Sequence, residues 1–145
     1  MNKKILALLS IFAIVMIGCA YAADSTESAN NTVTISGINF TIPEGMTENV
    51  AEEIINETGT DDDYTFLTNS KTFEDDENIV VVSVSTYEQN LTEDYLKDIG
   101  EKTTIGNTTG YLEDMGVLTL FSYIQDNDLV VITSNNKTLV EETLS

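Results

Sequence analysis

The chain has 145 residues, 25 aspartates and glutamates against six lysines and arginines, and a formal net charge of −19. It holds one cysteine, no histidine and no tryptophan. This composition argues against nucleic acid as a partner, because phosphate binding needs clustered lysine or arginine. It also excludes catalytic triads and metal sites that depend on histidine, and we expect no enzyme.

The chain opens with the residue order of a secretion signal, which we predict over residues 1–22. Lys3 and Lys4 precede an apolar run from Ile5 to Ile17, and small residues follow. The run is too short to span a ~30 Å hydrocarbon core, which takes roughly 20 residues. We therefore expect an extracytoplasmic protein, either secreted or held at the outer face of the cell membrane.

Two processing routes are open at the end of this signal. Cleavage at Ala20-Tyr21-Ala22, after Ala22 or Ala23, frees the chain. Lipidation of Cys19, the last residue of Met16-Ile17-Gly18-Cys19, anchors it to the membrane. An uncleaved membrane stub is a third alternative. Contact with the membrane is thus expected only through the signal segment or a lipid anchor.

A polar tether over residues 23–31 precedes a single predicted domain over residues 32–145. In this domain Val33 and Ile35 alternate with polar residues, and after Gly37 the apolar phase shifts to Ile38 and Phe40. A period of two that slips at glycine predicts a bulge or a tight turn between two short strands.

Further strands are indicated downstream. Residues 64–73 are typical of one strand or two, and residues 79–84 are apolar on both faces, which favours a central, covered strand. Three more strands are expected at residues 102–105, 117–124 and 129–133, the last two joined by a turn at residues 125–128.

Three segments show helical spacing. Residues 47–58 place Val50, Ala51, Ile54 and Ile55 on one face, with Gly59 as the stop. A second helix is expected from Thr92 as N-cap to Gly100, and a third from Asn136 to Leu144. Together with the strands, they predict an α+β fold, a single mostly antiparallel β-sheet with two or three short helices packed on it.

The segment Phe40-Thr41-Ile42-Pro43-Glu44-Gly45-Met46 resembles the opening of the PsbP and Mog1-like α/β sandwich domains, in which a strand enters an Ile-Pro-x-Gly turn. Met46 stands where those domains often have tryptophan. Small domains of this kind occur in secreted proteins of methanogenic archaea. The resemblance implies an antiparallel sheet sandwiched by helices and a binding or accessory role, and it implies no catalytic residue.

Two acidic loops are candidates for a metal site, at residues 61–63 and 74–77. If the loops approach each other, Asp61, Asp63, Asp75 and Glu77 are candidate ligands for Ca²⁺, which prefers six to eight oxygen ligands. The alternative is that both are solvated loops that maintain solubility, because contiguous aspartates point in diverging directions.

Asn-x-Thr sequons and tyrosines complete the candidate sites. The sequons predict N-glycosylation at Asn30, Asn39, Asn56, Asn90, Asn107 and Asn136. Each asparagine also has a structural alternative as a turn, strand or cap residue. A group of aromatic side chains either fills a core or lines a groove. The group consists of Tyr64, Tyr87, Tyr95, Tyr111 and Tyr123 with Phe66, Phe73 and Phe121.

The leading functional hypothesis is a secreted or surface-tethered, non-enzymatic binding or accessory domain that recognises a protein or an envelope component. The first alternative is a divalent-cation-binding domain that takes Ca²⁺ through its acidic loops. The second is a carboxylate-dependent hydrolase, which needs two acids in one cleft.

Overall fold

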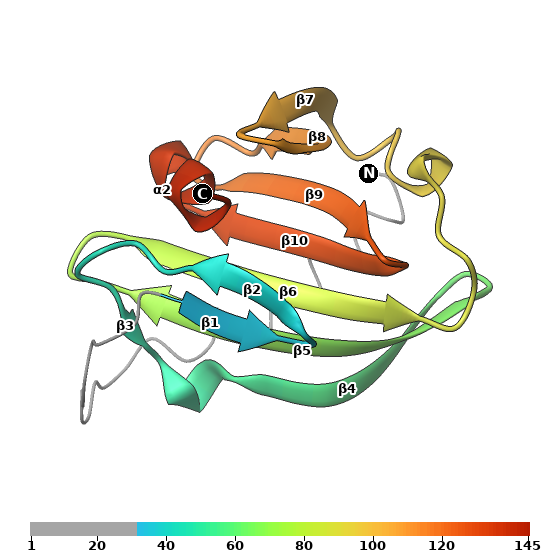
Figure 1. Cartoon of the computed structure of the whole chain (residues 1–145), viewed down its shortest axis with the longest axis horizontal. Helices are drawn as coiled ribbons and strands as arrows, with labels where there is room; N and C mark the ends of the chain where they lie inside the picture. Colours follow the sequence, from blue (N-terminus) through green and yellow to red (C-terminus); the bar gives the residue numbers. More distant parts are fainter. Residues whose placement is uncertain (1–31) are drawn as a thin grey trace.

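The computed structural model describes residues 32–145. These residues form an eight-stranded antiparallel sheet and a separate hairpin of β1 (Thr32–Ile35) and β2 (Ile38–Thr41). The strands of the sheet are β3 (Thr47–Glu48), β4 (Ile54–Asp61), β5 (Tyr64–Glu74), β6 (Ile79–Tyr87), β7 (Glu101–Ile105), β8 (Thr108–Asp114), β9 (Thr119–Gln125) and β10 (Asp128–Ser134). The prediction of a mostly antiparallel sheet is confirmed (Figure 1).

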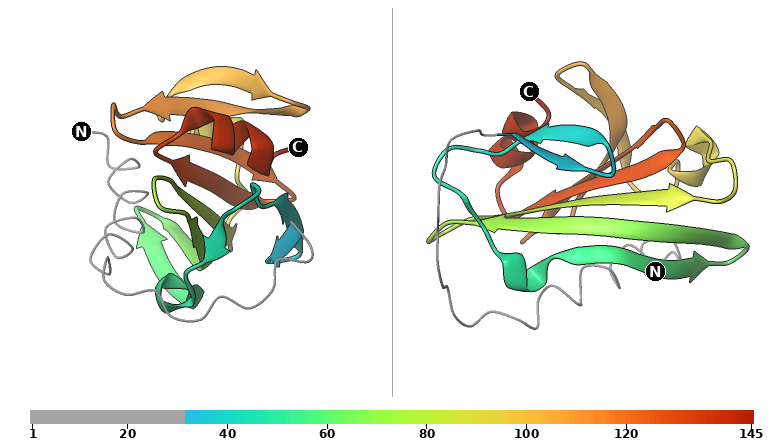
Figure 2. Two further views of the ribbon diagram at one scale, coloured as in Figure 1. Left: turned by 90° about the vertical axis from the view of Figure 1, so that its left-hand side faces the viewer. Right: turned by 60° about the horizontal axis from the view of Figure 1, so that its bottom comes forward.

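The order of the strands in the sheet differs from their order in the sequence. β3 and β4 both pair with one edge of β5, and the sheet continues through β6, β10, β9, β8 and β7. After β6 the chain therefore crosses to the far edge of the sheet, and β7 to β10 then return strand by strand until β10 pairs with β6. Figure 2 shows the twist of the sheet between its two edges.

One side of the sheet, which we call the aliphatic face, is covered by the β1–β2 hairpin and by helix α2 (Lys137–Thr143) (Figure 1). Its centre consists of side chains from β6 and β10 that are 0% exposed, namely Val80, Val82, Val84, Val130 and Ile132. Burying such a side chain stabilises a fold by roughly 1.5–3 kcal/mol. This face is the main apolar core.

The opposite side, which we call the hydroxyl face, has small polar side chains across its middle. They are all buried, and they are Thr68, Ser70, Thr72, Ser83, Ser85, Ser122 and Thr133. Residues 88–100 cross one end of this face, where Leu91, Tyr95 and Leu96 pack against Phe66 and Tyr87.

The first two strands confirm the predicted phase shift as a tight turn. Ser36 and Gly37 form the turn with φ angles of 49° and 83°, and Ile35 pairs with Ile38. Two positive φ angles give the turn whose twist matches that of the flanking strands. The hairpin thereby directs Ile35 and Phe40 to the aliphatic face.

The predicted helix over residues 47–58 is wrong. This segment forms β3, a 3₁₀ turn η1 (Val50–Glu52) and the start of β4, so that Ile55 is 64% exposed rather than buried. The free edge of β5 supplies backbone hydrogen-bond partners, and β-branched isoleucines and threonines suit a strand. Gly59 is not a helix stop, because it lies inside β4, where an added Cβ would come within 2.4 Å of the Phe66 ring.

The predicted helix over residues 92–100 is also wrong. Only the 3₁₀ turn η2 (Glu93–Tyr95) forms there, and the side chain of Thr92 makes no capping hydrogen bond. Long-range contacts set this path instead, because Leu91 N–H donates to Asn127 Oδ1 at 2.7 Å and the Tyr95 hydroxyl donates to Asp61 at 2.7 Å. The apolar residues Leu91, Leu96 and Ile99 are nevertheless buried.

The final predicted helix is confirmed as α2. Asn136 is its N-cap, with Oδ1 accepting from Thr138 N–H at 3.1 Å, and Val140 packs on the aliphatic face. It is the one α-helix among residues 32–145. The strand β8 was not predicted, although the Gly106-Asn107 turn before it is a hairpin signal.

Candidate functional site

An open pocket of about 400 Å³ lies on the aliphatic side, beside the β1–β2 hairpin. Its walls come from the hairpin, the start of β8, the end of β9 and the last turn of α2. The hairpin and the end of α2 are held together by a hydrogen bond of 2.7 Å from the Thr41 hydroxyl to the carbonyl oxygen of Ser145. Segments distant in sequence thus form one concavity of the size that small ligands occupy.

Tyr123 is the most informative residue of this pocket. Its side chain is 6% exposed and packs beside Phe121, with 5.9 Å between the ring centroids. Its hydroxyl has no hydrogen-bond partner among residues 32–145. Burial raises the pKa of Tyr123 to about 12. Tyr123 lines the pocket, and a hydroxyl without a protein partner is available to a ligand.

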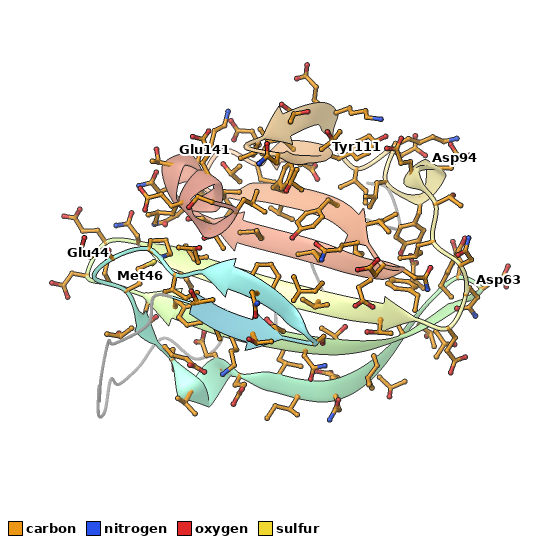
Figure 3. All side chains as sticks on the ribbon, in the orientation of Figure 1. Glu44, Met46, Asp63, Asp94, Tyr111 and Glu141 are labelled. Atoms are coloured by element: carbon orange, nitrogen blue, oxygen red, sulfur yellow. The ribbon has the colours of Figure 1, made fainter. Side chains whose placement is uncertain are left out.

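The remaining polar groups of the pocket are amides and hydroxyls. Asn39, Thr108 and Gln125 line it, and the Asn39 Oδ1 atom accepts a hydrogen bond from Thr34 at 2.6 Å, which orients the amide. No aspartate, glutamate or lysine side chain contributes to the lining. The chain has a net charge of −19, and the absence of charged side chains from the lining distinguishes the pocket from the acidic surface, which includes Glu141 on α2 (Figure 3).

The predicted metal ligands do not meet in space. Asp61 and Asp63 lie at the β4–β5 turn, whereas Asp75 and Glu77 lie at the β5–β6 turn, at the other end of the 11-residue strand β5 (Figures 1 and 3). A strand of that length spans roughly 35 Å. Within residues 32–145, no three His, Cys, Asp or Glu side chains are placed to share a metal ion.

Asp75 instead builds its own turn. Its Oδ1 atom accepts hydrogen bonds from the backbone N–H groups of Glu77 at 2.8 Å and Asn78 at 2.7 Å. These hydrogen bonds and those from the Asn78 side chain lower the pKa of Asp75. The geometry agrees with the alternative that this loop is a solvated acidic turn.

Asp61 belongs to a buried hydrogen-bond chain. The Tyr95 hydroxyl donates to Asp61 Oδ2 at 2.7 Å, and the hydroxyls of Tyr87 and Tyr95 are 3.1 Å apart. Burial raises the pKa of Tyr87 to about 12, and burial together with these partners raises that of Tyr95 further. These hydrogen bonds join β4 and β6 to residues 88–100, and they hold that segment on the sheet.

The aromatic residues mainly form the core, in agreement with the first of the two alternatives. Tyr87, Tyr95, Tyr111 and Tyr123 are buried, together with Phe66, Phe73 and Phe121. Tyr123 alone among these tyrosines lines the pocket described above. The sequence did not distinguish Tyr123 from the other tyrosines. Alternation along a strand predicts on which face of the sheet a side chain lies, but not whether that side chain lines a pocket.

The sequons differ in their surroundings. Asn39, Asn56, Asn90 and Asn107 are exposed, and Asn136 is partly buried as the N-cap of α2. Asn30 and Cys19 lie outside the described residues, as do the predicted signal and tether. No helix within residues 32–145 is long and apolar enough to cross a membrane.

Comparison of the chain with protein-family models, with curated proteins and with solved structures gives no match. The resemblance to PsbP and Mog1-like domains therefore stays an expectation.

Proposed function

We propose that this chain is a secreted or surface-tethered, non-enzymatic binding domain whose pocket around Tyr123 takes a neutral polar ligand. The observation that carries the proposal is the pocket itself, an opening of about 400 Å³ without a charged side chain, in a strongly acidic protein. The secreted location is supported by the order of residues 1–22.

Saccharides of an envelope glycan are the first ligand class to test. Sugar hydroxyls both donate and accept hydrogen bonds, and so do the amides of Asn39 and Gln125 and the hydroxyls of Tyr123 and Thr108. No charged side chain of the lining is placed to pair with a charged ligand. The absence of aspartate and glutamate side chains from the lining also supports a binding role over hydrolysis, because hydrolysis of a glycoside uses two carboxyl groups at the reacting bond.

The proposal can be tested by NMR titration of the ¹⁵N-labelled protein with a panel of neutral mono- and disaccharides. Shift changes are expected at β2, at the end of β9 and at the end of α2. Tyr123→Phe removes only the hydroxyl and should weaken binding about tenfold, which corresponds to a hydrogen bond of roughly 1.4 kcal/mol.

Tyr111→Phe is the matched control, because Tyr111 is also buried but lies on the hydroxyl face, where it pairs with Ser122. Binding by this variant should equal that of the original protein. Shift changes confined to another surface, or equal binding by Tyr123→Phe, would show that the pocket is not the binding site.

A further inference from the structure

The five sequon asparagines within residues 32–145 fall into two groups, according to whether the side-chain amide makes hydrogen bonds in the fold. The side chains of Asn56, Asn90 and Asn107 are exposed and make no hydrogen bond within residues 32–145. Those of Asn39 and Asn136 take part in hydrogen bonds of the folded domain. This difference bears on modification, because a side-chain amide that is hydrogen-bonded in the fold has to leave its partner before it can enter the site of a glycan-transferring enzyme.

The three free amides lie where the backbone leaves regular pairing. Asn56 is in the irregular stretch of β4 between Ile54 and Glu57, with a φ of 52°, on a strand whose one partner among the described residues is β5. Asn90 lies in the segment after β6, and Asn107 is in the turn between β7 and β8. Such positions present the side chain to a modifying enzyme without breaking a strand pair.

The other two amides are engaged. Asn136 Oδ1 accepts from Thr138 N–H at 3.1 Å, and its Nδ2 donates to Asn78 Oδ1 at 3.4 Å across to the β5–β6 turn. Asn39 lies in the paired strand β2, accepts from the Thr34 hydroxyl at 2.6 Å and lines the Tyr123 pocket. The threonine of its sequon, Thr41, is also engaged through its bond to Ser145.

We propose that the folded domain is N-glycosylated at Asn56, Asn90 and Asn107, and that Asn39 and Asn136 serve as structural amides without sugar. The donor is an oligosaccharide linked through its anomeric carbon to a lipid phosphate. The amide nitrogen forms a bond to that carbon, the carbon–oxygen bond to phosphate breaks, the lipid phosphate leaves with the electron pair, and the amide releases one proton. The proposal is independent of the ligand assigned to the pocket, and it leaves Asn39 free to line that pocket.

The test is peptide-resolved mass spectrometry of the full-length chain produced in its native host. Sugar is expected on the peptides that contain Asn56, Asn90 and Asn107 and not on those that contain Asn39 and Asn136. Sugar at Asn39 or Asn136 to a comparable extent would overturn the proposal, because attachment would then ignore the folded environment. Unmodified Asn56, Asn90 and Asn107 would overturn it as well.

Two pairs of variants at the sequon threonines sharpen the test. Thr58→Ala removes the sequon of Asn56 and Thr58→Ser keeps it, and Thr58 is an exposed residue. The alanine variant should lose one glycan in intact mass, and the serine variant should keep it. Thr138→Ala and Thr138→Ser should both match the unaltered protein, since no sugar is expected at Asn136. A glycan lost from Thr138→Ala alone would contradict the assignment.

Discussion

The two faces of the sheet are both buried, but the same strands direct apolar side chains to one face and hydroxyl side chains to the other. On β6, Val80, Val82 and Val84 face the β1–β2 hairpin and α2, whereas Ser83 and Ser85 lie on the opposite side. On β9, Phe121 and Ser122 are neighbours that are each 0% exposed and belong to opposite faces. One face is stabilised by apolar burial, and the other has to satisfy hydroxyl groups.

The hydroxyl face meets this requirement only in part. Thr68 and Ser85 are 2.7 Å apart, and Ser83 donates to Ser70 at 2.9 Å. The hydroxyls of Thr72 and Ser122 and one carboxylate oxygen of Glu113 have no partner among residues 32–145. Because burying a polar group without a hydrogen bond costs free energy, equal burial on the two faces does not mean equal stabilisation. Truncation on the aliphatic face should therefore lower stability, whereas on the hydroxyl face the sign of the change should depend on whether the removed hydroxyl has a hydrogen-bond partner.

The largest effect is expected from Phe121→Ala on the aliphatic face. Removal of this fully buried ring leaves a cavity beside Tyr123, and the free energy of unfolding should fall by about 3–5 kcal/mol. Urea denaturation measures the change, with Val117→Ala as the control, because Val117 is 79% exposed. A loss below about 1 kcal/mol would mean that the aliphatic face is not the main core.

A smaller loss is expected from Tyr95→Phe at the covered end of the hydroxyl face. This change removes the donor to the buried carboxylate of Asp61 and should cost roughly 1–3 kcal/mol. Thermal unfolding measures it, and hydrogen exchange should show earlier opening of residues 88–100. Tyr111→Phe is the control, and equal stabilities for the two variants would argue against an anchoring role for the hydrogen-bond chain.

Ser122→Ala should have the opposite sign. The variant deletes a buried hydroxyl without a partner, so the free energy of unfolding should stay constant or rise by up to about 1 kcal/mol. Ser83→Ala serves as the contrasting variant, because it breaks the bond to Ser70 and should cost roughly 0.5–1.5 kcal/mol. If both variants lose the same stability, the distinction between satisfied and unsatisfied hydroxyls fails.

The smallest effect concerns pH. Burial raises the pKa of Glu113 above its ordinary value of 4.5, so the carboxyl proton is held more tightly in the folded state than in the unfolded state. The stabilisation is present below the unfolded pKa and is lost as the pH rises through the folded one. Glu113→Gln should therefore lose less stability than the original protein between about pH 4 and pH 7. Urea midpoints at both pH values test this, and parallel losses would contradict it.

The predictions from sequence succeeded where a local pattern had one structural solution. The valines and alternating serines of residues 79–87 require a strand with two buried faces, and positive φ angles at Asp126 and Asn127 match the predicted hairpin turn. Asn136 caps α2 as its residue type favours. Negative charge, the absence of histidine and the sequons are properties of the chain itself.

Tertiary structure decided the segments whose patterns allowed two solutions. The isoleucines at 54 and 55 fit one helical face as well as an edge strand, and the free edge of β5 selects the strand. The separation of the acidic loops follows from the length of β5, which the sequence left open as one strand or two. The pocket around Tyr123 depends on the hairpin, β8, β9 and α2 meeting at one place. Such long-range packing has no local signature, because each segment contributes only one or a few residues to the site.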